Sequence, residues 1–191
     1  ARRGPKMRAI IQTAAGAPLE PRTVPRPEPG PGAVLIDVEA CAVCRTDLHL
    51  IDAELPDIPY PLIPGHQVVG RVALSRAPAL GVGVRVGVPW LAWTCGACEY
   101  CVQGLENLCD RARFTGYTVP GGYAEQTVAD ARYCFPLDET VHAATLAPLL
   151  CAGLIGYRAL RMCGTAARVG LFGFGAAAHV LAQVLRHQQR E

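Results

Sequence analysis

The chain has 191 residues, of which 51% are hydrophobic and 18% are charged. A composition this rich in apolar residues is typical of a globular protein and excludes a disordered chain. The net charge is +2 and no basic stripe runs along the sequence, so we expect no nucleic-acid partner. The longest apolar stretch, residues 143–157, contains Pro148 and is too short to span a bilayer, so we expect no membrane partner.

Cysteine usage is the most informative part of the composition. The chain contains nine cysteines, and no apolar run follows the basic residues near its beginning. Without a secretory signal we expect a cytoplasmic protein, in which thiols stay reduced. An odd number of thiols also excludes complete pairing within the chain. Metal binding is therefore the leading interpretation of the cysteines.

Residues 1–137 predict short extended segments separated by turns. Residues 14–32 are rich in proline, which excludes a helix and favours extended chain. A short helix is expected at 44–51, with Thr46 or Asp47 near its start. The expected strands, each bounded by turn signals, are 33–40, 67–74, 82–88, 121–129 and 133–137. Such a series indicates a small β-barrel or an irregular β-domain.

The pattern changes near residue 139. Residues 139–150 have helical character, broken by Pro148, and residues 151–162 predict a buried helix. A short apolar strand is expected at 168–172 and a helix at 175–189. The apolar face of this last helix consists of Ala176, Ala177, Val180, Leu181, Val184 and Leu185. The order of strand, glycine turn and helix is typical of the opening of an α/β unit.

Four cysteines lie close together in the segment CGACEYCVQGLENLC. Spacings of three, three and eight residues let one loop wrap their thiolates around a single ion. Zinc suits four sulfur ligands, and with every position filled by protein the ion would be structural. The alternatives are free thiols, two disulfides or an iron–sulfur cluster, although the spacing does not fit the common ferredoxin patterns. The four residues are Cys95, Cys98, Cys101 and Cys109.

A second candidate metal site is dispersed along the chain. Cys44 lies in CRTDLH, His66 in PGHQ and Cys151 in LLCAGLIGY. Each residue alone is a weak signal, because a lone buried cysteine usually packs as a small hydrophobe. Pro64 and Gly65 predict a turn that can present the imidazole, and the apolar run around Cys151 can supply a dry pocket. Two thiolates and one imidazole would leave a fourth zinc position open, as a catalytic zinc requires.

Together these motifs resemble the zinc-dependent alcohol dehydrogenases of the medium-chain dehydrogenase/reductase family, over nearly the whole chain. The resemblance implies a mainly β, GroES-like catalytic domain at residues 1–150, with a structural-zinc lobe at about 91–112. Residues 151–191 would begin a Rossmann domain that binds NAD(P), of which only the first β–α unit of an incomplete α/β fold is present. The dispersed cysteines and histidine match the catalytic-zinc ligands of the family, and the four clustered cysteines match its structural-zinc ligands.

The resemblance also assigns roles around the catalytic zinc. Thr46 and His49 match the residues that hydrogen-bond the alcohol and pass its proton toward solvent. Asp47 matches the carboxylate that orients the ligand histidine, and Arg45 matches a position near the cofactor pyrophosphate. Gln67 departs from the family, because most relatives carry glutamate after the ligand histidine.

Two tryptophans fall where relatives line the substrate pocket. They are Trp90 and Trp93, just before the four-cysteine loop. A narrow aromatic pocket would favour small or medium apolar alcohols and aldehydes. Core packing is the alternative for both, and for Trp93 it is at least as good an explanation.

The glycine turn GFGAAAH is a GxGxxA form of the dinucleotide fingerprint. Gly173, Gly175 and Ala178 occupy its fixed positions, where small residues allow a pyrophosphate to approach a helix N-terminus. The acidic residue that reads the ribose is expected about 20 residues beyond the glycines, at or past Glu191. The choice between NAD and NADP therefore stays open.

The resemblance implies a fragment of an enzyme with two zinc ions and NAD or NADP. The parent would oxidise a small alcohol reversibly to an aldehyde or ketone, and we expect it to be a homo-oligomer. The chain alone is expected to be nearly inactive, because most of the dinucleotide site is missing, and the apolar face of its last helix would need a cover. The alternative is a non-catalytic zinc-binding structural or interaction module. A zinc-free relative of the quinone-reductase type agrees less well with the full ligand set.

Overall fold

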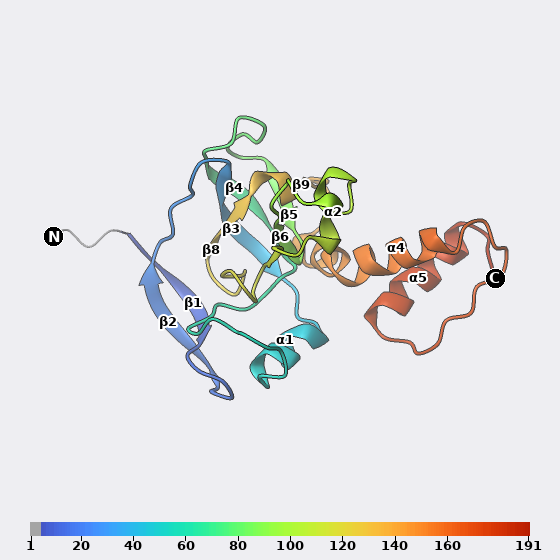
Figure 1. Ribbon diagram of the computed structural model, residues 1–191, viewed down its shortest axis with the longest axis horizontal. Helices are drawn as coiled ribbons and strands as arrows, with labels where there is room; N and C mark the ends of the chain where they lie inside the picture. Colours follow the sequence, from blue (N-terminus) through green and yellow to red (C-terminus); the bar gives the residue numbers. More distant parts are fainter. Residues whose placement is uncertain (1–4) are drawn as a thin grey trace.

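The computed structural model describes residues 5–191, which form a β-rich body with a pair of C-terminal helices extending from one side (Figure 1). The chain opens with an antiparallel hairpin of β1 (Lys6–Gln12) and β2 (Leu19–Pro25). The proline-rich stretch is extended, as expected, but the strand within it was not predicted. Its prolines are tolerated because, within residues 5–191, β2 pairs with β1 alone and its other edge has no partner strand.

The central element is a five-stranded antiparallel sheet in the order β8-β3-β4-β5-β9. Its strands are β3 (Ala33–Cys41), β4 (Val68–Ser75), β5 (Arg85–Val88), β8 (Gln126–Asp130) and β9 (Phe135–Pro136). Fully buried β-branched residues such as Val34, Ile36, Val68 and Val86 form its core. Such side chains pack well on a pleated surface. The predicted strands are therefore confirmed, although the last three begin later than expected.

Helix α1 (Arg45–Ile51) follows β3 and confirms the short helix expected there. Its N-cap is Cys44, whose sulfur accepts a hydrogen bond from the Thr46 amide at 3.3 Å. Asp47 accepts from the Cys44 amide at 2.8 Å, so the two side chains form a reciprocal capping box. The cap thus lies slightly earlier than predicted, because a thiol takes the place of the usual hydroxyl or carboxylate.

A small lobe is inserted between β5 and β8. It consists of β6 (Leu91–Trp93), α2 (Glu99–Val102), the 3₁₀ turn η1 (Glu106–Leu108) and β7 (Arg113–Phe114), with β6 and β7 paired antiparallel. Between residues 95 and 110 the only buried residue is Cys109. Hydrophobic packing alone therefore does not hold this loop in place. A further 3₁₀ turn, η2 (Ala131–Tyr133), links β8 to β9.

The C-terminal part is helical. Its elements are α3 (Ala143–Leu146), the 3₁₀ turn η3 (Ala147–Leu150), α4 (Ala152–Met162) and α5 (Ala176–His187). Helices α4 and α5 lie side by side, and Leu160, Leu181 and Leu185 form the buried core between them (Figure 1). The apolar face predicted for the last helix is thus covered in part by α4.

Two expectations for this region are wrong. The helix at 152–162 is not buried throughout, because Ile155 is 61% exposed and Met162 is 79% exposed. The strand expected at 168–172 does not form, and the Val169 amide donates instead to the Glu191 carbonyl at 2.6 Å. A strand needs a neighbour for its backbone groups, and none pairs with this segment within residues 5–191.

Within the described residues, no single helix is long and apolar enough to cross a membrane. Only the consecutive pair Ala143–Leu150 and Ala152–Met162 reaches the required length and hydropathy, and it is bent by 49°.

Candidate functional site

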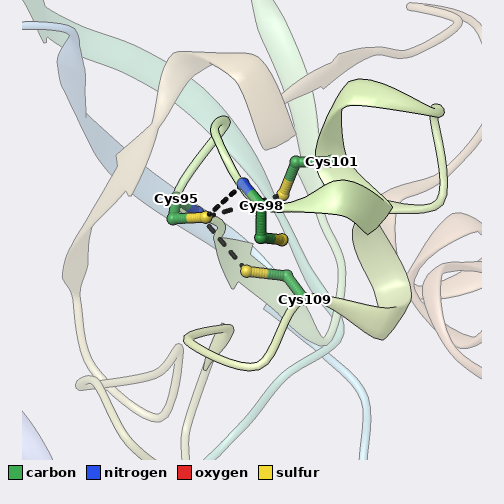
Figure 2. Close-up of side chains that lie close together, drawn as sticks. All are labelled: Cys95, Cys98, Cys101 and Cys109. Carbon is green, nitrogen blue, oxygen red and sulfur yellow. Dashed lines mark hydrogen bonds between the residues drawn. The ribbon is translucent and has the colours of Figure 1, made fainter.

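The four clustered cysteines converge in the small lobe. Figure 2 shows their side chains turned toward one another, and their sulfur atoms all lie within 4.8 Å of each other. The loop can close because Gly96, at φ +68°, adopts a left-handed conformation directly after the first cysteine. The sulfurs of Cys95 and Cys101 are 3.9 Å apart.

Backbone amides stabilise negative charge at this cluster. The amides of Ala97 and Cys98 donate to the Cys95 sulfur at 3.4 and 3.3 Å (Figure 2 draws the second of these). These bonds lower the pKa of the Cys95 thiol to about 5. A thiolate is the form of cysteine that binds metals.

The donor set of this lobe fits zinc. Four sulfurs in one loop give the ligand type and number of a closed structural site. None of the nine cysteines, all of which lie in the described part of the chain, forms a disulfide. A bound ion would also supply the anchoring that the loop lacks in apolar core.

The three dispersed residues also meet in space. Cys44 precedes α1, His66 precedes β4 and Cys151 precedes α4, yet their ligand atoms lie within 4.8 Å of one another. The Cys44 sulfur is 3.2 Å from Nε2 of His66, which is completely buried. Two sulfurs and an imidazole nitrogen are the ligand types of a three-residue catalytic zinc site, so this set fits zinc as well.

The pKa values of the two thiols in this second cluster are shifted in opposite directions. The Cys151 thiol donates to the Cys44 sulfur and, against the effect of burial, this bond and His66 lower the pKa of Cys44 to about 4. The same bond, together with burial, raises the pKa of Cys151. Burial opposes protonation of His66, but Asp47 and Cys44 outweigh it and raise the pKa of the imidazole to about 9. The site therefore holds anionic sulfur next to an imidazole that already faces it.

Asp47 lies behind the imidazole, as its assigned role requires. Its Oδ1 atom is 3.2 Å from Nδ1 of His66, and both side chains are almost completely buried. The carboxylate thus faces the ring nitrogen opposite the one that points to Cys44. A carboxylate in this position selects the tautomer and orientation of a ligand histidine.

The other α1 residues with assigned roles lie on one short helix. Thr46 is half-buried beside the cluster, and His49 follows it by three residues, so both occupy the same helix face. His49 is 38% exposed, and its Nδ1 contacts the Glu54 carboxylate. Arg45 is exposed at the first turn.

The two tryptophans have different surroundings in the structure. Trp90 packs edge-on against His66, with ring centroids 4.9 Å apart. It also stacks on Phe114 and Tyr117, which sequence reasoning missed although both follow the last clustered cysteine closely. Trp93 instead lies under the Arg113 guanidinium and lines a different cavity of about 750 Å³. None of the three dispersed ligands lines that cavity.

The predicted dinucleotide turn is exposed at the start of α5. Gly173 has φ +83°, a conformation that favours glycine, and Gly175 is the N-cap of the helix. No other side chain caps this end, so the first amides of α5 stay available. Ala178 lies in the first turn of the helix.

Comparison with known proteins gives consistent matches. The alcohol dehydrogenase GroES-like domain family matches residues 30–139. The probable alcohol dehydrogenase AdhA of Mycobacterium tuberculosis is 46% identical over 184 residues, which cover 91% of this chain and 53% of that protein. An alcohol dehydrogenase of Geobacillus stearothermophilus is 41% identical over 182 residues, covering 93% and 54%. The chain spans about half the length of these curated relatives.

Solved structures agree with this assignment. A cinnamyl alcohol dehydrogenase from Sorghum bicolor is similar with a TM-score of 0.87 at 28% identity, over 97% of this chain and 56% of that one. A structure of CAD from Helicobacter pylori in complex with NADP(H) gives 0.81 at 27% identity, over 93% and 56%. The β-rich body is thus a GroES-like domain, and the chain belongs to the zinc-dependent alcohol dehydrogenases of the medium-chain dehydrogenase/reductase family.

Proposed function

We propose that this chain carries the catalytic zinc site of an enzyme that oxidises a small alcohol reversibly and transfers hydride to NAD or NADP. The observation that carries the proposal is the meeting of Cys44, His66 and Cys151 within 4.8 Å, although they come from three distant segments. Zinc bound there would act as a Lewis acid that polarises the alcohol oxygen and lowers the pKa of its hydroxyl.

The chain's own residues would carry the hydroxyl proton of the alcohol to solvent. Oxidation sends a hydride to the nicotinamide and a proton to solvent, so the hydroxyl proton needs an exit. Thr46 would accept it at Oγ1 and His49, one turn further along the half-exposed face of α1, would pass it to water. The contact between His49 and Glu54 would hold the imidazole in place during transfer.

The surrounding residues would orient the ligands and exclude water. Asp47 would fix the His66 imidazole so that Nε2 faces the sulfurs. Trp90, with Phe114 and Tyr117 stacked on it, would form one apolar wall of the substrate site. This wall favours an apolar alcohol over a charged one.

We further infer which part of the chain forms each domain. Residues 1–150, of which 1–4 lie outside the described residues, would be the catalytic domain, with the structural-zinc lobe at about 91–112. Residues 151–191 would open the cofactor domain, where the turn of Gly173, Gly175 and Ala178 would receive the pyrophosphate and Arg45 would approach it from α1. A homo-oligomeric parent stays a prediction.

The proposal is tested by counting zinc. The purified chain is expected to hold two zinc ions, and Cys44→Ser or His66→Asn should reduce the count to one, as should Cys98→Ser through the other site. Cys163→Ser, which removes an exposed thiol outside both clusters, is the matched control and should leave two. Native mass spectrometry with elemental analysis gives the numbers.

The same zinc count distinguishes the proposed catalytic site from a non-catalytic zinc module. The cofactor side of this chain consists of a helical hairpin without the expected strand, which favours a non-catalytic zinc module as the second candidate. A wild-type chain with one zinc ion that is unaffected by His66→Asn would support the module. The isolated chain should show little or no turnover with ethanol or a longer alcohol and either cofactor, and robust turnover would contradict the fragment interpretation.

A further inference from the structure

Three buried polar atoms at the Cys44–His66–Cys151 cluster have no hydrogen-bond partner. They are Nδ1 of His66, Oδ1 of Asp47 and the hydroxyl oxygen of Tyr123. Oδ2 of Asp47 accepts from the Cys44 amide at 2.8 Å, and Oδ1 lies 3.2 Å from His66 Nδ1 without good hydrogen-bond alignment. A completely buried carboxylate is costly unless donors surround it. Oδ1 of Asp47 can therefore accept from a further donor besides His66 Nδ1, and Tyr123 has a donor without an acceptor.

The backbone around Tyr123 is bound to the turn that presents His66. The amides of Gly121, Gly122 and Tyr123 donate to the carbonyls of Ile63, Gly65 and Pro64, at 2.7, 2.8 and 3.0 Å. Three consecutive amides thus bind three consecutive residues of the turn. On its other side, the Tyr123 carbonyl accepts from the Ile10 amide of β1 at 2.7 Å. The Tyr123 main chain is fixed from both sides.

The Tyr123 ring is in tight contact with the same turn. Gly65 has φ +95°, and a Cβ atom at this position would lie 2.5 Å from Cδ1 of Tyr123 and 2.8 Å from the Cys41 sulfur. Only glycine leaves room for the ring directly before His66. Ring and turn therefore pack as one unit, and the phenol has little freedom to move away.

The hydroxyl end of the ring reaches the region of Asp47. Burial, and next the negative charge of Asp47, raise the pKa of the Tyr123 phenol above its usual value. The phenol consequently stays protonated at neutral pH. It is available as a donor to a carboxylate, and its charge state does not change over the working pH range.

We propose that Tyr123 is a positioning residue of the catalytic metal site, whose hydroxyl donates to the Asp47 carboxylate and holds it against His66. The inference rests on the proposed function, because it assigns Tyr123 a role through the zinc ligand His66. Tyr123 would touch neither substrate nor metal. It would act two contacts away, by reducing the number of orientations open to Asp47 and hence to the imidazole.

The test compares Tyr123→Phe with wild type in the 191-residue chain. Phenylalanine keeps the ring against Gly65 and removes only the hydroxyl. An excess of chelator is added and the release of zinc is followed with time. The phase of zinc release that is absent in His66→Asn belongs to the Cys44–His66–Cys151 site. We expect Tyr123→Phe to accelerate that phase by about 10-fold, the lower end of effects seen when outer-shell partners of a ligand are removed. The phase of the four-cysteine lobe should not change.

The control is Tyr157→Phe, since Tyr157 is 49% exposed on α4 and belongs to neither metal cluster. It should leave both phases unchanged. A double-mutant cycle then tests the route of the effect. If Tyr123 acts through Asp47, Tyr123→Phe should have no further effect in an Asp47→Asn background. A general folding defect would instead add to the effect of Asp47→Asn. The cycle therefore distinguishes a role through Asp47 from a folding defect, even if Tyr123→Phe lowers stability.

The outcomes separate the two proposals. A wild-type chain with no extraction phase dependent on His66 would overturn the proposed function. A wild-type chain with that phase, whose rate is the same in Tyr123→Phe, would overturn the role of Tyr123 alone. Additive effects in the cycle would also overturn it.

Discussion

Cys134 and Cys163 are both free thiols, but the fold buries the first and exposes the second. Cys134 is 6% exposed in the core of the main sheet, and burial followed by the charge of Asp130 raises the pKa of its thiol to about 12. Cys163 lies exposed just after α4. Only the thiolate is nucleophilic, and its fraction falls as the pKa rises.

We predict that iodoacetamide at pH 8 modifies Cys163 in the folded chain and leaves Cys134 unmodified. The pH lies well below the pKa of Cys134, so almost no thiolate is present there, and burial blocks access as well. Peptide mass spectrometry after timed quenching gives both rates, and the same reaction in denaturant shows that Cys134 reacts once exposed. Equal rates in the folded chain would be incompatible with this core.

At this scale the sequence predicted ligand residues better than their surroundings. The spacing of the four clustered cysteines alone predicted a metal site. The dispersed ligands were weak signals singly and were grouped by their surrounding motifs and the family resemblance. Trp90 and Trp93 could not be told apart, because only the path of the lobe brings Trp90 to His66 and Trp93 to Arg113. Tyr123 gave no signal, since a lone tyrosine in a glycine-rich segment is ordinary.

Among the elements, the turn at Ile63–His66 depends on close backbone packing. A Cβ atom at Gly121 would overlap the carbonyl oxygens of Gly65 and Pro64, which are backbone atoms with little room to move. Gly81 is exposed, and a Cβ atom there would meet nothing within 4 Å. The two glycines therefore form a matched pair for substitution.

We predict that Gly121→Ala lowers the free energy of unfolding by about 3 kcal/mol, as overpacking of a tight site does. It should also weaken zinc binding that depends on His66. Gly81→Ala should change stability by less than about 0.5 kcal/mol. Urea unfolding of the zinc-loaded chains supplies both numbers, and similar values for the two variants would show that the turn tolerates displacement.

Elements were predictable where local pattern and tertiary surroundings agree. Strands β3, β4 and β5 are rich in β-branched residues and find partners on the sheet, so their positions follow from the sequence. The segment 168–172 has the same local character but no partner strand within the described residues, and it stays irregular. Strand β2 was missed for the opposite reason, because pairing with β1 overrides its prolines.

Among the described residues, the two most exposed large apolar side chains, Phe172 and Met162, lie outside the β-rich body. Phe172 is fully exposed and Phe174 is 67% exposed, both in the connection between α4 and α5. Exposed aromatic residues next to a half-covered helix pair favour association. The GroES-like body carries its own core and does not depend on this region.

We predict that the isolated chain self-associates with rising concentration and that the double variant Phe172→Ser/Phe174→Ser shifts it toward the monomer. Sedimentation velocity over a range of concentrations measures the shift. Val82→Ser, which removes an apolar side chain 66% exposed in the β4–β5 connection, should leave association unchanged. Equal association of all three proteins would exclude the helix connection as the contact.

The sulfur of Cys44 serves a helix and a metal site with a single atom. It begins α1 by accepting the Thr46 amide, and it is also one of the two sulfurs that converge with His66. A single substitution of Cys44 would consequently remove both a proposed zinc ligand and the N-cap of the segment that bears Thr46 and His49. One side chain would thus anchor both the proposed metal site and the start of the proposed proton exit.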